Sequence, residues 1–124
     1  MWELLSVGCG GFVGAVARWS LSGWVQRLSG GDFPLGTYVA NMVGCLFIGL
    51  VFALVEARPE WSPHVRLFLM VGLLGAFTTF STFSHETLDL LQGGSWTLAV
   101  VNILGSVMVG LLAVVVGRYL GRLI

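Results

Sequence analysis

Charged residues are scarce in this chain, and lysine is absent. Only 10% of the 124 residues are Asp, Glu, Lys or Arg, and all six cations are arginine. A soluble domain of this length needs more charge to cover its surface. The six cations balance six acids, so no basic patch is available for nucleic-acid phosphates. The composition therefore predicts a membrane protein and excludes nucleic-acid binding.

Cysteine and histidine are also rare, with two residues each. Cys9 and Cys45 lie within apolar stretches, so we expect both to pack as small buried hydrophobic residues. His85-Glu86 does not open an H-E-x-x-H zinc motif, because Asp89 occupies the position of the second histidine. No nucleophile elbow of the G-x-S-x-G type is present. We expect no enzyme activity.

Apolar sequence is abundant: 56% of residues are hydrophobic, and the mean hydropathy is +0.93. A bilayer core of about 30 Å needs about 20 apolar residues in a helix. Four stretches reach that length, separated by short joints rich in Gly and Pro, and Ser95 is a candidate N-cap for the last. The chain is thus predicted to be a single four-helix transmembrane domain, residues 1–124. The predicted spans run near Leu4 to Val25, Leu35 to Val55, Val65 to Leu90 and Trp96 to Leu120.

An even number of spans places both termini on one side of the membrane. That side carries four arginines and the other carries two, which favours cytoplasmic termini only weakly and leaves insertion in both orientations open. The four are Arg58, Arg66, Arg118 and Arg122, and the two are Arg27 and Arg18, which lies inside its span.

Glycine is unusually frequent, with 18 residues. Several stand four apart and form small faces that let helix backbones approach closely in lipid. Packing within one bundle explains any single pair as well as a subunit interface does. Tightly packed helices leave little room for a pore inside one chain, so an ion path would lie between two copies, which favours a homodimer. The clearest pairs are Gly10 with Gly14 and Gly117 with Gly121.

A run of hydroxyl and aromatic residues, Thr78-Thr79-Phe80-Ser81-Thr82-Phe83-Ser84, interrupts the third apolar stretch. Because Gly75 and clustered threonines lower helix stability, we predict that the helix breaks near Gly75 to Thr78. Two such breaks meeting on a twofold axis would form a small oxygen cage suited to sodium. A continuous helix whose Ser and Thr side chains bond to the preceding turn is the alternative.

Uncharged groups in this region suit a small anion. Phe80 and Phe83 share a helix face, and the positive edges of their rings attract an anion without trapping it. The amide of Asn41 has the same capacity. From the residues alone, ordinary packing is the better explanation of the two rings, whereas a helix–helix hydrogen bond explains Asn41 as well as donation to an anion does. The run itself supplies weak hydroxyl donors. We include Thr79, Ser81, Ser84 and Ser106 among the candidate pathway residues.

Other polar residues have plainer interpretations. Asn102 and Ser106 stand four apart and form a polar stripe that we expect to hold helices together. Arg18 either extends to the interface or lies in a water-filled vestibule that attracts anions. Glu86 and Asp89, near the end of the third span, are expected to be solvated.

Four short patterns, one in each span, together resemble a known family. They are Gly10-Gly11…Gly14-Ala15…Arg18, Gly36-Thr37…Asn41…Gly44, Gly75-Ala76-Phe77-Thr78-Thr79-Phe80-Ser81-Thr82-Phe83 and Asn102…Gly105-Ser106. The third pattern is highly specific at this membrane depth. Together they are similar to the small bacterial fluoride channels, the Fluc or CrcB family.

The resemblance implies an all-α membrane protein with four transmembrane helices and a broken third helix, assembled as an antiparallel dual-topology homodimer with two fluoride pathways. It implies a structural sodium ion at the dimer centre, held by main-chain oxygens of Gly75 and Thr78. It also implies that Phe80 and Phe83 line the pathways and that Asn41 donates to fluoride. By the same likeness, Arg18 lies near a vestibule, and Thr37 and Glu86 contribute to the opposite end.

We therefore expect a passive channel that lets fluoride leave the cell across the bacterial inner membrane. Hydrogen fluoride enters from an acidic medium and ionises inside, so a leak for the anion prevents accumulation. Two alternatives stay open. One is a small proton-coupled multidrug exporter, which needs a membrane-embedded carboxylate; the other is a non-conducting membrane assembly subunit held together by the small-residue faces.

Overall fold

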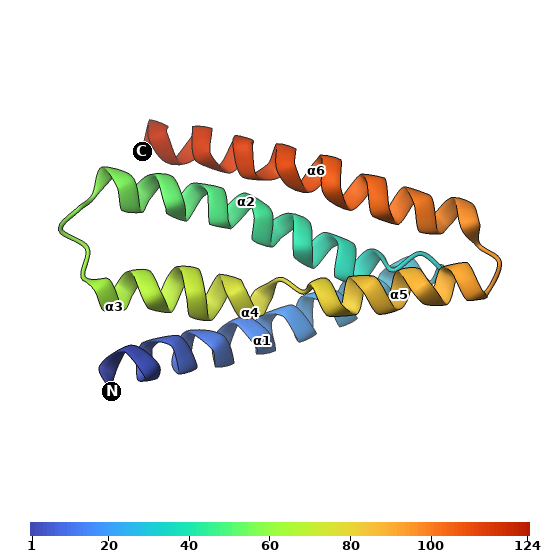
Figure 1. Cartoon of the computed structure of the whole chain (residues 1–124), viewed down its shortest axis with the longest axis horizontal. Coiled ribbons are helices and arrows are strands. Elements are labelled where there is room, and N and C mark those ends of the chain that lie inside the picture. Colours follow the sequence, from blue (N-terminus) through green and yellow to red (C-terminus); the bar gives the residue numbers. More distant parts are fainter.

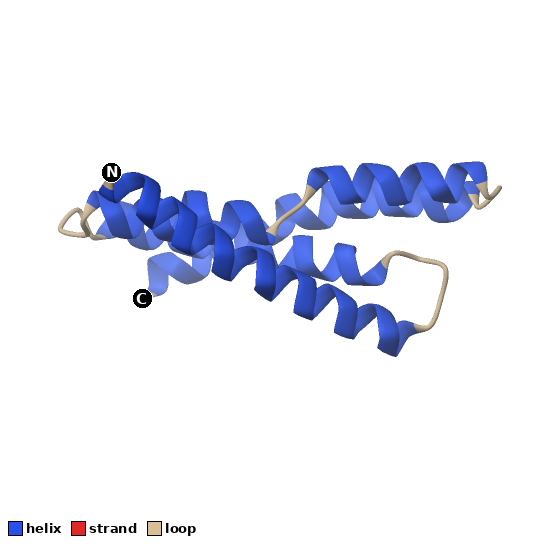
Figure 2. Cartoon of the chain, turned by 90° about the horizontal axis from the view of Figure 1, so that it is seen from below, coloured by secondary structure: helices blue, strands red, loops and turns tan.

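The computed structural model describes all 124 residues and contains helices but no strand (Figure 2). Four helical segments are long and apolar enough to cross a membrane. The third segment, Pro63–Gln92, is made of four shorter elements. The elements are α1 (Trp2–Ser29), α2 (Leu35–Ala57), α3 (Pro63–Arg66), the π-helix η1 (Leu67–Leu74), α4 (Gly75–Phe77), α5 (Phe80–Gln92) and α6 (Trp96–Leu123).

The four predicted spans are confirmed. Each of them extends a few residues beyond its predicted bounds: the first and third at both ends, the second and fourth at the C-terminal end. Both termini lie at the same end of the bundle, beside the loop that joins α2 to α3 (Figure 1). Ser95 occupies the N-cap position of α6 as predicted, but its side chain makes no capping bond. Ser62 does cap: its hydroxyl accepts from the Val65 N–H, with Pro63 in the first turn.

The third span is broken, so the continuous-helix alternative is wrong. Thr78 (φ −89°, ψ 154°) and Thr79 (φ −147°, ψ 121°) are extended, and α5 restarts at Phe80. The break lies at the C-terminal end of the predicted region, because Gly75 itself is helical (φ −63°, ψ −37°). Glycine permits an interruption, but the interruption occurs where the Thr79 hydroxyl caps the next helix.

Glycines form two seams within the chain. Along the first, Gly10 and Gly14 of α1 pack against η1, and a Cβ at Gly14 would overlap the Leu73 carbonyl. Along the second, a Cβ at Gly117 of α6 would overlap the Leu46 carbonyl of α2. These glycine pairs therefore serve packing inside one bundle. Cys9 on α1 is exposed, so the prediction that it is buried is wrong. It lies in an open hollow beside His64 of α3 and Phe68 of η1, where the helices do not close over it.

The α1–η1 seam predicts a position-specific cost for one added methyl group. Gly14→Ala should lower the free energy of unfolding by about 1–3 kcal/mol, because the backbone of η1 blocks the new Cβ. Gly11→Ala is the matched control, since nothing lies within 4 Å of its Cβ position. That control should be neutral or stabilising by about 0.5–1 kcal/mol. Thermal unfolding of the detergent-solubilised protein measures both, and equal melting temperatures would contradict the seam.

Candidate functional site

The break is held open by one side chain from the neighbouring helix. Asn41 of α2 accepts from the Thr79 N–H at 2.8 Å through Oδ1 and donates to the Thr79 carbonyl at 3.0 Å through Nδ2. An amide side chain thus satisfies both backbone groups of the extended residue, as a neighbouring strand would. The helix–helix interpretation of Asn41 is confirmed. Its second amide hydrogen has no partner within the chain and stays available to a ligand.

The hydroxyls on either side of the break satisfy the adjoining helix ends. Thr79 Oγ1 accepts from the Thr82 N–H at 3.3 Å and lies 3.1 Å from Thr82 Oγ1 and 3.3 Å from Ser81 Oγ. On the other side, Thr78 Oγ1 donates to the Leu74 carbonyl at 3.1 Å. Much of the predicted hydroxyl run is therefore engaged in stabilising the break itself.

Carbonyl groups at the end of α4 lose their usual donors. The Thr79 N–H, which would bond to the Gly75 carbonyl in a continuous α-helix, donates to Asn41 instead. The Thr82 N–H, which would bond to the Thr78 carbonyl, donates to the Thr79 hydroxyl. Carbonyl oxygens freed at membrane depth need another partner. The oxygens of Gly75 and Thr78 therefore fit the chemistry of a hard cation such as sodium.

A groove of about 490 Å³ opens beside the break. Phe80 and Phe83 line it with ring centroids 5.6 Å apart, which confirms that they share a face, and Phe80 is 79% exposed. No charged side chain lines this groove. Five of the candidate pathway residues and both candidate sodium ligands meet here: Asn41, Thr79, Phe80, Phe83 and Ser106, with Gly75 and Thr78.

Other candidates lie outside the groove. Ser81 and Ser84 are exposed on α5, and Ser84 Oγ donates to the Phe80 carbonyl at 2.9 Å.

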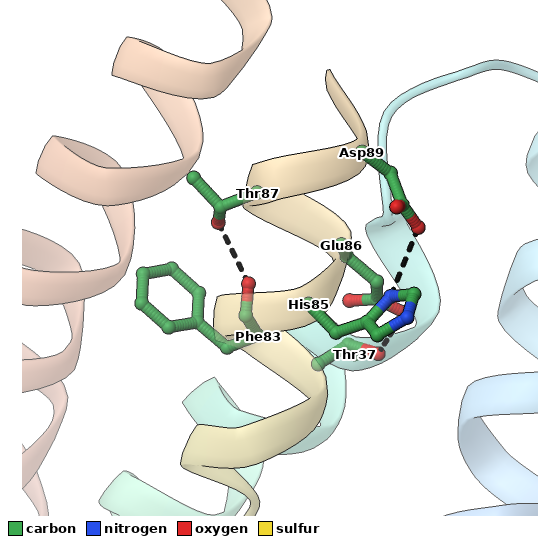
Figure 3. A network of polar contacts seen from close by, with 6 residues as sticks. All are labelled: Thr37, Phe83, His85, Glu86, Thr87 and Asp89. Carbon is green, nitrogen blue, oxygen red and sulfur yellow. Dashed lines mark hydrogen bonds and ion pairs between the residues drawn. The ribbon is translucent and has the colours of Figure 1, made fainter. Parts of the chain in front are cut away.

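A second polar contact joins α2 to α5 away from the groove: Thr37 donates to Glu86 Oε1 at 2.8 Å (Figure 3). Glu86 is half-buried and its Oε2 has no partner, so the prediction that it is solvated is wrong, because α2 covers it. Asp89 is exposed beside His85, as expected. Arg18 lies on α1 and contacts the Ala76 carbonyl at the end of α4.

A buried polar chain connects α6 to α5. Asn102 is 1% exposed and donates to Thr87 Oγ1 at 2.9 Å, and Thr87 donates to the Phe83 carbonyl at 2.7 Å. Ser106 Oγ lies 3.5 Å from Asn102 Oδ1. The prediction that Asn102 holds helices together is confirmed. The role of Thr87 was not predicted from the sequence, although Thr87 stands four residues after Phe83 and so shares its face of α5.

These features define a class: a multi-pass membrane protein with a broken helix beside an uncharged, mostly apolar groove that also carries aromatic, amide and hydroxyl groups. Residues 5–118 match the family described as "CrcB-like protein, Camphor Resistance (CrcB)", and the chain belongs to this family.

Curated relatives cover nearly the whole chain. A protein from Maridesulfovibrio salexigens named "Fluoride-specific ion channel FluC" is 43% identical over 124 residues, covering 100% of this chain and 98% of the relative. "Fluoride-specific ion channel FluC 1" from Methanosarcina acetivorans is 48% identical over 118 residues, covering 95% of this chain and 89% of the relative. A protein of the first name from Chloroflexus aurantiacus is 43% identical over 120 residues, covering 97% and 95%.

The two asparagines should differ in what their removal costs. Asn41→Leu leaves both Thr79 backbone groups without partners and should lower the free energy of unfolding by about 3 kcal/mol. Asn102→Leu should cost about 1 kcal/mol, because Thr87 keeps its bond to the Phe83 carbonyl. Chemical or thermal unfolding in detergent compares the two variants. Equal costs would show that Asn41 does not support the break.

Proposed function

We propose that this chain forms a channel through which fluoride leaves the cell passively. The observation that carries the proposal is the uncharged groove at the break, in a chain whose relatives are named fluoride-specific ion channels. Those names also agree with the expectation that the chain is not an enzyme. As a multi-pass membrane protein of this family, it fits the bacterial inner membrane.

Neutral groups suit the conduction of a small halide. Fluoride must exchange its water shell for protein groups, and a full positive charge would hold it too tightly to release. The edges of Phe80 and Phe83 and the free amide hydrogen of Asn41 offer partial positive charge in one groove. The hydroxyls of Thr79 and Ser106 line the same groove. Thr37 and Glu86 then form one end of the route, and Ser81 and Ser84 extend it along α5.

A structural sodium ion fits the carbonyl groups freed at the break. Gly75 and Thr78 would hold it through main-chain oxygens, and two copies would supply four such oxygens. A bound cation would offset the negative ends of the carbonyl dipoles and fix the extended backbone. The sodium is a structural ion and is not transported.

A second, antiparallel copy would complete the site. The exposed face of α5 carries Ser81, Ser84 and His85, which are polar residues inside a membrane span. Exposed polar side chains do not face lipid and turn instead toward protein or a water-filled cavity. Phe80, 79% exposed at the edge of the groove, lies on the same helix. A homodimer whose copies cross at the break would cover this face and close the groove into a pathway.

Fluoride flux through purified protein tests the channel directly. Reconstituted liposomes should release fluoride far faster than chloride, as read by a fluoride electrode. Phe80→Ile and Phe83→Ile should each slow release about tenfold, the effect of about 1.4 kcal/mol on a rate, because they remove the ring edges. Phe12→Ile is the matched control, since Phe12 is 72% exposed on α1 and lies outside the groove.

Each contrary outcome has a specific meaning. Equal release of fluoride and chloride would remove the selectivity, and normal flux in both ring variants would place the route elsewhere. Release of a cationic dye driven by protons would support the exporter alternative.

The dual orientation is testable in cells. The variant Glu60→Cys, made together with Cys9→Ser and Cys45→Ser, carries one labelling site in the exposed loop between α2 and α3. Loss of an acid there alters orientation little, because arginines and lysines decide it. About half of the protein should react with an impermeant maleimide from outside intact spheroplasts. Labelling from one side only would refute dual topology, and native mass spectrometry checks the dimer.

A further inference from the structure

Arg18 makes a long-range contact that neither attraction of anions nor extension to the interface explains. Its Nε donates to the Ala76 carbonyl at 3.1 Å, across 58 positions of sequence, and the group is partly buried. Ala76 belongs to α4, the short helix that ends at the break. The other guanidinium nitrogens make no hydrogen bond within the chain.

The glycine seam explains how Arg18 reaches this carbonyl. Gly10, Gly14 and Arg18 are spaced four apart, so they follow one face of α1. Gly10 packs against the backbone of Phe68 and Gly72, and Gly14 against that of Leu73. One turn further along α1, the same face meets Ala76, three residues beyond Leu73. Backbone contact at the glycines thus brings α1 close enough for a side chain to end on α4.

The carbonyl that Arg18 contacts is one that the break frees. In a continuous α-helix the Phe80 N–H would bond to Ala76, but the extended Thr78 and Thr79 carry Phe80 away. Arg18 replaces that donor through its Nε–H, so the freed Ala76 carbonyl keeps a hydrogen-bond partner. The neighbouring carbonyls of Gly75 and Thr78 receive no such donor.

We propose that Arg18 is a positioning residue of the break: it holds the end of α4 so that the oxygens of Gly75 and Thr78 stay arranged for a cation. This inference rests on the proposed function, since the cation is the proposed sodium. The Nε–H that bonds to Ala76 carries this role, and the charge of the guanidinium as an attractant for fluoride does not.

Two substitutions separate the hydrogen bond from the charge. Gln places its side-chain nitrogen the same number of bonds from Cα as Arg Nε, so Arg18→Gln keeps a donor and removes the charge. Arg18→Met has similar length and removes both. Arg27→Met is the matched control, because it removes another α1 arginine that is exposed and makes no bond to α4.

The first readout is the melting temperature of purified protein in sodium salt against N-methylglucamine salt. Sodium should raise it by about 5 °C for the wild type, Arg18→Gln and Arg27→Met, and not for Arg18→Met. The second readout is fluoride efflux from liposomes, which should fall about tenfold more for Arg18→Met than for Arg18→Gln. If Arg18→Met does not fold, the comparison of wild type with Arg18→Gln decides.

Loss of the sodium shift in Arg18→Gln, or equal loss of flux in both Arg18 variants, would overturn the inference. Either result would show that the positive charge of Arg18, and not its hydrogen bond to Ala76, is what the protein needs. A wild type without a sodium shift would overturn it as well. A wild type that passes no fluoride would refute the proposed function instead, and the melting comparison would still decide the role of Arg18.

Discussion

Every backbone group of a membrane-embedded chain needs a hydrogen-bond partner, and this constraint organises the molecule. Three spans meet it with unbroken helices. The third span does not, and its interruption survives because groups from two other helices replace the missing bonds. Asn41 of α2 pairs with both polar groups of Thr79, and Arg18 of α1 takes the Ala76 carbonyl. The break is therefore a tertiary feature that three helices maintain together.

Close backbone packing is the second requirement. Arg18 and Asn41 reach the break only because glycines let α1 and α2 approach the third span. Gly14 lies against the Leu73 backbone, and a Cβ at Gly44 would overlap the Thr78 side chain. The glycine content and the polar break are therefore linked, since larger residues would separate the helices and leave the freed carbonyls without donors.

The sequence was sufficient for the spans, the break and the pairing of Phe80 with Phe83, because hydropathy, glycine placement and helical spacing are local signals. It did not reveal which partner each polar residue takes. The contact of Arg18 with Ala76 joins residues 58 apart, and Glu86 is covered by a helix that lies far away in sequence. The break was also predicted too close to Gly75, whereas the extended residues are Thr78 and Thr79. Glycine indicates where a helix can end, but the cap at Thr79 decides where the next helix begins.

The π-helix η1 has a consequence for every residue that follows it. One turn of a π-helix contains more residues than one turn of an α-helix, and each additional residue rotates the following helix by about 100° about its axis. An ordinary helical wheel drawn through the third span therefore assigns the wrong azimuth to α4. A deletion between Leu67 and Leu74 would rotate α4 relative to α1 and move the Ala76 carbonyl away from Arg18. The number of residues between Gly72 and the break therefore determines whether Arg18 meets the Ala76 carbonyl.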